Sequence, residues 1–244
     1  MKSAFRASDY SDGLLAGVFV LLAGIVLLRP TLLVPARPAN ESVVVAAGRR
    51  LPAPTDPQSL AGVPLLGAKT APVVIMVYSD FECPYCKVFA ETALPQIRAE
   101  LVDTGKAAVA FRHYPLDAIH PVARQAAVVA ACAADQGAFW KVHDLLFASA
   151  ARLDNERLQD VIVRASLDPA QIAACGEAEG NVRVRLDAAS GRALLVRATP
   201  SFALGLRTSP DEMQVLRVIS GVMTADQLLN ELATMGASVG TPAG

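Results

Sequence analysis

This sequence has no excess of positive or negative charge, few histidines and only one closely spaced cysteine pair. Its 244 residues carry 22 basic and 23 acidic side chains, for a formal net charge of −1, and the arginines form no basic block. That pattern argues against a nucleic-acid partner. Only three histidines and four cysteines occur, and no second Cys-x-x-Cys or His-x-x-x-His completes a zinc site. We therefore expect neither a nucleic-acid interface nor a bound metal, and we find no internal repeat.

Apolar residues are abundant, and one run of them lies near the N-terminus. Residues 13–28 carry no charge, and beyond Arg29 the apolar run continues to residue 34. A membrane-spanning helix needs about 20 mainly apolar residues, and the Arg29 side chain can snorkel to the interface. We therefore predict a short tail over residues 1–12 and a transmembrane anchor in the lipid bilayer over residues 13–34.

A cleaved signal peptide is the alternative for this run, because Val34-Pro35-Ala36 has small residues at the spacing of a cleavage site. Either segment would send the rest of the chain to the membrane. Arg29, Arg37, Arg49 and Arg50 follow the uncharged stretch 13–28, and only Lys2 and Arg6 precede it, so the positive-inside count would keep the rest in the cytoplasm. Long domains translocate largely regardless of flanking charge, and the cysteine usage favours an oxidising compartment. We place the domain outside the cytoplasm, on a single-pass membrane protein.

The segment after the anchor differs in composition from the rest of the chain. Residues 35–62 hold five prolines and few large apolar side chains, which is typical of an extended, semi-stiff tether. We expect the globular domain over residues 63–244.

The globular part begins with a strand, a helix and a second strand. The β-branched run Val73–Tyr78 is typical of a strand covered on both faces. A helical pattern begins at Pro84, and a break is expected at Pro95. A second strand, Ala107–Tyr114, follows this helical crossover and should therefore be parallel to the first.

A helical block then runs from Pro121 to about Val196, which is too long for a simple connection. Asp154 and Asp168 are expected to cap helices within it. Two strands at about 202–206 and 214–219 follow, and then a final helix capped by Thr224. This order predicts an α/β thioredoxin fold with a helical insertion over about 119–180.

One cysteine pair stands where the first strand ends and the helix begins. Cys83 and Cys86 are three residues apart, close enough to form a disulfide within about one helical turn. Pro84 suits the first helical position, and the free N–H groups and positive dipole end of the helix favour a thiolate at Cys83. Half a zinc site and two inert buried cysteines are the other interpretations, but the strand–Cys-x-x-Cys–helix context favours a thioredoxin-like redox pair. Cys83 should be the exposed, attacking sulfur and Cys86 the more buried resolving thiol.

Several segments, taken in order, resemble the DsbA-like thiol–disulfide oxidoreductases; they are residues 63–67, 72–86, 111–116, 131–140 and 199–202. The resemblance runs from about residue 63 to the C-terminus. It implies that Cys83 forms the mixed disulfide with a substrate, so that the Cys83–Cys86 disulfide serves in place of a bound cofactor. It also implies a cis-proline at Thr199–Pro200 that faces the pair, with the preceding backbone pairing with bound substrate. Without the resemblance, Thr199–Pro200 indicates only a helix stop and a strand edge.

The other two cysteines, Cys132 and Cys175, fall in two helices of the expected insertion. They are either small buried hydrophobic residues or a structural disulfide of the kind that some DsbA-like relatives have, and we favour the disulfide. The three histidines, His113, His120 and His143, are expected to have structural roles.

Residues beside the pair should adjust its chemistry. Pro84 and Tyr85 lie between the two cysteines, and a neutral tyrosine cannot donate a charge to the thiolate as a histidine could. Glu82 places a carboxylate next to Cys83, which works against thiolate formation.

The proton acceptor for Cys86 is left open by the sequence. Many relatives keep a buried acid six residues before the first cysteine, and this chain has Val77 there. Asp80 or Glu82, acting through water, are the candidates.

These features predict a membrane-tethered oxidase that donates the Cys83–Cys86 disulfide to secreted or periplasmic proteins with free thiols and is reoxidised by a membrane redox partner. A reductase or isomerase of the same fold is the first alternative, although residues 35–62 look too short and polar for the dimerisation module that an isomerase usually needs. A non-catalytic holdase or interaction domain, using an apolar groove around Pro200, is the second. Replacing Cys83 separates these classes, because a binding module would survive the change.

Overall fold

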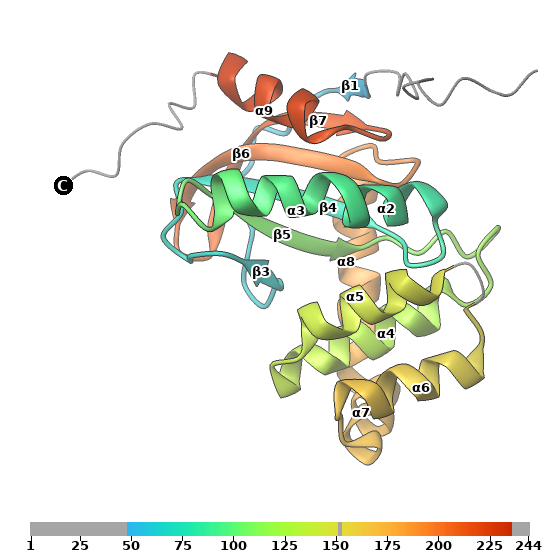
Figure 1. The fold of residues 1–244 in the computed structure, drawn as a ribbon. Helices are drawn as coiled ribbons and strands as arrows, with labels where there is room; N and C mark the ends of the chain where they lie inside the picture. The colour runs from blue at the N-terminus through green and yellow to red at the C-terminus, as the bar shows by residue number, and fades with distance from the viewer. Residues whose placement is uncertain (1–47, 151–152, 236–244) are drawn as a thin grey trace, which may run out of the picture. The chain divides into compact units, whose positions relative to one another are not determined.

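The computed structural model describes residues 48–150 and 153–235 (Figure 1). The expected tail, the anchor and residues 35–47 of the expected tether lie outside these ranges. Within them, no helix has both the length and the apolar character needed to cross a membrane.

A mixed β-sheet forms the centre of the domain, with β4 in the middle. The strands lie in the order β1-β7-β6-β4-β5-β3, and β2 also pairs with β7. Strands β4 and β5 are parallel, as expected for two strands joined by a helical crossover. The strands are β1 Arg49–Leu51, β2 Gln58–Ser59, β3 Leu65–Leu66, β4 Val73–Ser79, β5 Ala107–His113, β6 Ser201–Ser209 and β7 Glu212–Ser220.

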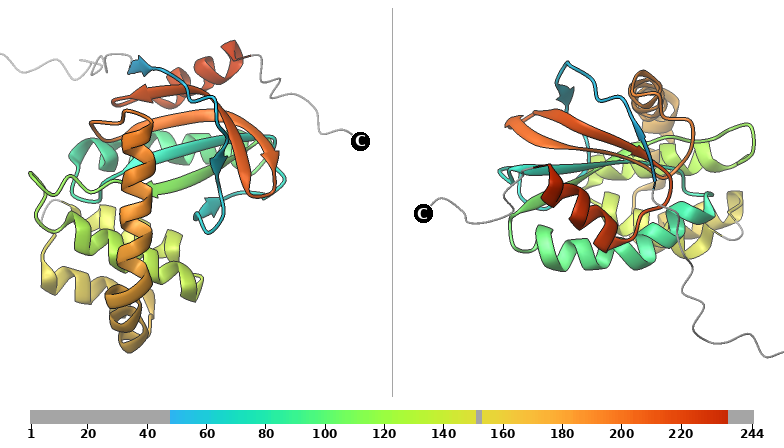
Figure 2. Two further views of the ribbon diagram at one scale, coloured as in Figure 1. Left: turned by 180° about the vertical axis from the view of Figure 1, so that it is seen from behind. Right: turned by 90° about the horizontal axis from the view of Figure 1, so that it is seen from above.

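Every residue of β4 is buried, because helices cover both faces of the sheet. Val73, Ile75 and Val77 pack against the helices that follow the cysteine pair and against α9 (Ala225–Thr234). The alternate residues of β4, Val74 and Met76 among them, face α8 (Asn181–Ala193), which crosses the opposite face (Figure 2). The unbroken apolar run is therefore explained by two-sided burial.

The helical segment after the cysteine pair does not stop at Pro95. It begins with α2 (Pro84–Val88) and includes α3 (Leu94–Ile97), and π-helical turns over 89–93 and 98–102 separate and extend them. Proline lacks the N–H that would continue the α-helical ladder, so the expected break takes the form of a local change of helical pitch. The segment ends before Gly105, which has a φ of +72°.

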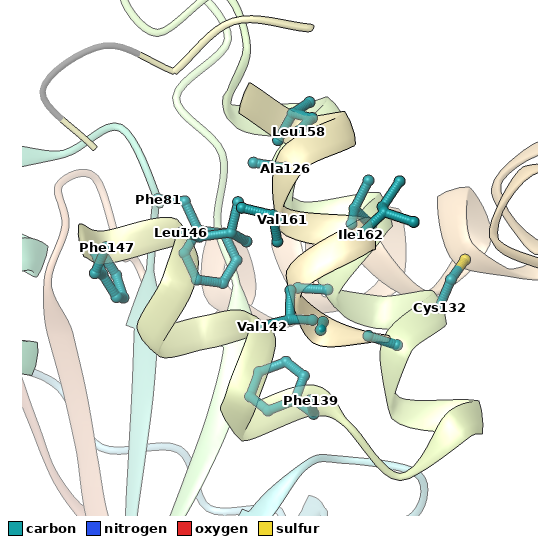
Figure 3. Packing of buried hydrophobic residues seen from close by; sticks show 14 of the residues in the cluster. Phe81, Ala126, Cys132, Phe139, Val142, Leu146, Phe147, Leu158, Val161 and Ile162 are labelled. Atoms are coloured by element: carbon teal, nitrogen blue, oxygen red, sulfur yellow. The ribbon is translucent and has the colours of Figure 1, made fainter. Parts of the chain in front are cut away.

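Four helices form the insertion, beside the edge of the sheet that carries β5 and β3 (Figure 1). They are α4 Ala123–Ala133, α5 Phe139–Ser149, α6 Asn155–Ala165 and α7 Pro169–Cys175. The Asp154 and Asp168 side chains cap α6 and α7 as predicted. Figure 3 shows Val142 and Leu146 of α5 packed with Val161 of α6 in one buried cluster, which Phe81 joins from the cysteine loop.

The predicted end of the tether at residue 62 is wrong, because the sheet domain begins earlier in the chain. Arg49–Leu51 and Gln58–Ser59 both pair with β7, and Leu60 is buried, with its N–H donating to the Asp211 carbonyl at 2.7 Å. These strands are short and mostly polar, so they depend on the ready-made edge of β7 and carry no periodic signal of their own. Residues 48–62 therefore belong to the sheet domain.

A disulfide joins Cys132 of α4 to Cys175 at the end of α7, with the two Cα atoms 5.8 Å apart. The chain passes close by at Gly180, where an added Cβ would lie 2.5 Å from the Cys132 sulfur. Glycine at this position therefore lets the start of α8 pack against the bridge.

Replacing Cys132 and Cys175 together by alanine should destabilise the domain. The bridge closes a 43-residue separation, which corresponds to about 4 kcal/mol in the chain-entropy account and often less in practice. Urea unfolding followed by the fluorescence of Trp140 measures the difference. In the intact chain, mild reduction followed by denaturation should expose two free thiols, and a count of four would contradict a bridge that outlasts the Cys83–Cys86 pair.

Candidate functional site

The cysteine pair lies at the point where β4 delivers the chain to the N-terminus of α2. Cys83 is the N-cap residue, in an extended conformation with φ −70° and ψ 120°, and Pro84 occupies the first turn. The backbone N–H groups of Tyr85 and Cys86 contribute to lowering the pKa of the Cys83 thiol. The free N–H groups at the start of this helix therefore favour the thiolate form of Cys83, as the sequence indicated.

Cys83 is more enclosed than we expected. Its residue is 4% exposed and Cys86 is 0% exposed, whereas Tyr85 between them is 61% exposed. The expectation of an exposed Cys83 was wrong because the loop before β6 covers the sulfur, and the thiol donates a hydrogen bond to the Thr199 carbonyl at 3.3 Å. The order of burial within the pair is still the expected one.

Thr199 and Pro200 form the covering loop, and the peptide bond between them is cis. The Thr199 hydroxyl is buried and has no hydrogen-bond partner among the described residues. Its carbonyl accepts from the Cys83 thiol, and the hydroxyl lowers the Cys83 pKa as a donor available to the thiolate. One residue thus offers an acceptor to the thiol and a donor to the thiolate.

The two sulfurs have pKa values pushed in opposite directions. A hydrogen bond from Cys86, followed by contributions from Thr199 and the helix N–H groups, lowers the pKa of Cys83 to about 6 against the effect of burial. Burial, and then the hydrogen bond and charge of Cys83, raise the pKa of Cys86 well above its usual value, while the Ser79 hydroxyl opposes this. Such a split assigns one thiol as the nucleophile and the other as a thiol that holds its proton.

The acidic residues near the pair connect the cysteine loop to the insertion. The Glu82 carboxylate accepts from the Val122 N–H at 2.6 Å, and it is not among the leading causes of the Cys83 pKa shift. The sequence predicts that this carboxylate opposes the thiolate, and the structure adds a second role, because the carboxylate anchors the loop to the segment before α4. Asp80 is also occupied, since it accepts from the Glu82 N–H and the Leu116 N–H and pairs with the His120 imidazole at 2.8 Å.

The remaining histidines lie apart from any arrangement suited to a metal. His113 is buried, and burial lowers its pKa to about 4, so it is neutral near pH 7. His143 is buried among aromatic rings, and its Nδ1 bonds the Asp144 carboxylate at 2.8 Å. In the part of the chain that the structure describes, no group of three or more potential ligands of the His, Cys, Asp and Glu types occurs.

Sequence reasoning missed two contributors to this region. Ser79, the last residue of β4, has a hydroxyl that lowers the pKa of the Cys86 thiol. Arg112 and Asp187 form an ion pair whose side chains are each 11% exposed, and it fastens β5 to α8. A serine at the end of a buried strand was the only signal for the first, and nothing local pairs Arg112 with a residue 75 positions away.

Comparison with known proteins agrees with this geometry. Residues 60–215 match the protein family described as Thioredoxin. Among solved structures, alpha-DsbA1 of Wolbachia pipientis superposes with a TM-score of 0.60 and 23% identity, covering 78% of this chain and 94% of that one. A likeness at this identity establishes the fold.

Two curated relatives have different names. The Na(+)/H(+) antiporter NhaA 3 of Salinispora tropica is 35% identical over 160 residues, which is 65% of this chain and 24% of that protein. Disulfide bond formation protein D of Bacillus subtilis is 32% identical over 92 residues, which is 36% of this chain and 40% of that protein. The chain thus spans about a quarter of the length of the antiporter, and the antiporter's name describes the whole of that longer protein.

The pKa split predicts selective alkylation of the reduced protein. The rate of Cys83 modification should rise with a midpoint near pH 6, while Cys86 should stay unmodified in the folded state because it is fully buried. Mass spectrometry of iodoacetamide-treated protein across pH 4 to 10 measures both, and a midpoint near the ordinary cysteine value of about 8.5 would contradict the assignment.

The stability of the reduced protein supplies a control for this prediction. Because the Cys83 pKa is lowered by folding, its contribution to stability is lost as the pH falls through about 6 and grows as the pH rises toward the unfolded value. The difference in unfolding free energy between the reduced protein and Cys83→Ser should therefore increase from pH 6 to pH 8.

Proposed function

Since the chain belongs to the thioredoxin family and is DsbA-like, we propose that it is a thiol–disulfide oxidoreductase that works as an oxidase of other proteins. The observation that carries this proposal is the opposed pair of pKa values at Cys83 and Cys86. A stabilised Cys83 thiolate favours the reduced pair, and a favoured reduced pair makes the Cys83–Cys86 disulfide an oxidant.

The oxidase reaction consists of two exchanges. A substrate thiolate attacks the Cys83 sulfur, the Cys83–Cys86 bond breaks, and Cys86 leaves as a thiolate that takes up a proton. A second substrate thiolate then attacks the substrate sulfur of the mixed disulfide, and Cys83 leaves as the thiolate that the helix N-terminus stabilises. The substrate gains a disulfide and the protein keeps two electrons and the Cys86 proton.

The surroundings of Cys83 suit a polypeptide substrate. The Thr199 carbonyl lies 3.3 Å from the Cys83 sulfur, so an extended substrate chain can place its own N–H there as an added strand. Tyr85, which lies between the two cysteines in the sequence, is exposed and offers an apolar surface to the residues that flank a substrate cysteine. We propose secreted or periplasmic proteins with free thiols as the substrates, and a membrane redox partner as the source of oxidising power.

Reduction or isomerisation of disulfides is the second candidate, because the same exchanges run in reverse. The lowered Cys83 pKa favours the oxidase, since it stabilises the product of substrate oxidation. A non-catalytic holdase is less well supported, because a binding role does not need two thiols with opposed pKa values.

Electron flow is tested by trapping the native protein. In cells, acid quenching followed by alkylation should find Cys83 and Cys86 mainly as the disulfide, and Cys86→Ala should accumulate mixed disulfides with secreted proteins. Equilibration of the purified protein with glutathione should give a potential between about −120 and −270 mV. A mainly reduced pool with a potential near −270 mV would make the protein a reductase, and unchanged partner binding by Cys83→Ser with no mixed disulfides would make it a binding module.

We further propose that residues 13–34 stay attached and hold the domain at the outer side of a membrane. The support is the long uncharged run and the name of the Bacillus subtilis relative, a disulfide bond formation protein. Carbonate extraction should leave the chain in the membrane fraction, and protease added to right-side-out vesicles should degrade the domain. A mature N-terminus near Arg37 would instead identify a cleaved signal peptide.

A further inference from the structure

The buried thiol of Cys86 must exchange a proton in every catalytic cycle. When the pair forms its disulfide, Cys86 loses this proton as its sulfur attacks Cys83 and expels the bound thiolate. When a substrate opens the disulfide, Cys86 leaves as a thiolate and regains the proton. The residue is 0% exposed, so solvent cannot take or return the proton directly.

Ser79 is the first group through which this proton can pass. It is the last residue of β4, it is 3% exposed, and its hydroxyl is placed to lower the pKa of the Cys86 thiol. A hydroxyl can donate to the thiolate and accept from the thiol. It carries no charge of its own, so the proton needs a further partner.

A small cavity adjoins Ser79. Its volume is about 10 Å³, and Val77, Ser79 and His143 line it together with aromatic and aliphatic side chains such as Phe111 and Trp140. That volume is at the lower limit for one water molecule, about 10 Å³. Two of the lining residues, Ser79 of β4 and His143 of α5, have polar side chains.

His143 connects this cavity to the surface. The side chain is 3% exposed, whereas that of its partner Asp144 is 79% exposed, and His143 Nδ1 lies 2.8 Å from Asp144 Oδ1. Nε2 is the one polar atom of the ring that Asp144 does not engage. A buried imidazole with a solvent-exposed carboxylate on its far nitrogen can accept a proton on one side and release it on the other.

We propose, building on the oxidoreductase function above, that Ser79, one water in this cavity and the His143–Asp144 pair form the relay that moves the Cys86 proton to and from solvent. During disulfide formation the Cys86 proton passes to the Ser79 oxygen, the Ser79 proton to the water, and a water proton to His143 Nε2, while Nδ1 delivers its proton through Asp144. Ser79 and the water each receive one proton as they give one up, and the imidazole passes from its Nδ1–H to its Nε2–H tautomer, which the reverse sequence undoes. The reverse sequence protonates the departing Cys86 thiolate.

The neighbouring polar groups are less suited to this task. Both Asp80 carboxylate oxygens accept backbone N–H groups, and one of them also pairs with His120. His113 is buried, with a pKa of about 4, so it does not hold a transferred proton near pH 7. His120 therefore supplies a matched control, because it is a histidine paired with an aspartate near the site but does not line the cavity.

The relay is tested by separating the two steps of thiol oxidation in the full-length protein. An aromatic disulfide that releases a coloured thiolate reports Cys83 attack as a first phase and Cys86 attack on the mixed disulfide as a second. Ser79→Ala and His143→Phe should slow the second phase by about 10²-fold, the lower range for lost proton transfer, and leave the first unchanged. The solvent deuterium isotope effect on the second phase should fall in both variants. His120→Gln should behave as the unmodified protein does.

Two further measurements keep the outcomes distinct. Ser79→Thr, which retains a hydroxyl, should recover most of the second-phase rate, whereas a lost strand-end contact would not be rescued in this way. Unchanged second phases in Ser79→Ala and His143→Phe, equal slowing of both phases, or slowing in His120→Gln alone would overturn the relay. Absence of any first phase in the unmodified protein would overturn the oxidoreductase function itself.

Discussion

The burial of β4 between one parallel and one antiparallel neighbour is the constraint on which the site depends. Its partner β5 runs parallel to it, and β6 runs antiparallel with Tyr78 opposite Ser201. That register places the start of β6, and so Pro200 just before it, at the end of β4 from which the cysteine loop departs. The pairing of β4 with β6 therefore brings the start of α2 and the loop that covers Cys83 to the same end of the sheet.

The insertion is part of the redox site as well as an addition to the fold. Cys83 and Cys86 belong to the same buried cluster as Phe81 and the facing residues of α5 and α6. Figure 3 shows Phe81, Val142 and Leu146 of this cluster. Glu82 and Asp80 accept from backbone N–H groups of the segment that leads into α4. Moving the insertion would therefore change both the packing of the sulfurs and the position of the loop that holds them. The packing of the insertion can in this way alter the chemistry of the Cys83–Cys86 pair.

Sequence patterns predicted those parts of the structure whose causes are local. The run at Val73–Tyr78, the caps at Asp154 and Asp168, and the cysteine pair before Pro84 each depend on neighbours within a few residues. The parts missed depend on distant partners. Arg49–Leu51 forms a strand only by pairing with β7. Cys83 is covered by Thr199, which lies 116 positions further along the chain. The anchoring role of Glu82 was missed for the same reason, since its partner Val122 is set by how the insertion docks.

Thr199 connects the protonation state of Cys83 to the hydrogen bonds of the covering loop. Its carbonyl accepts from the Cys83 thiol. This donor is lost when the thiol ionises, with a pKa of about 6, and it is lost again when the pair forms its disulfide. A buried acceptor is costly to leave unpaired, so near neutral pH the Thr199 carbonyl needs another N–H donor in both redox states. Under the function proposed above, the backbone of a bound polypeptide supplies that donor.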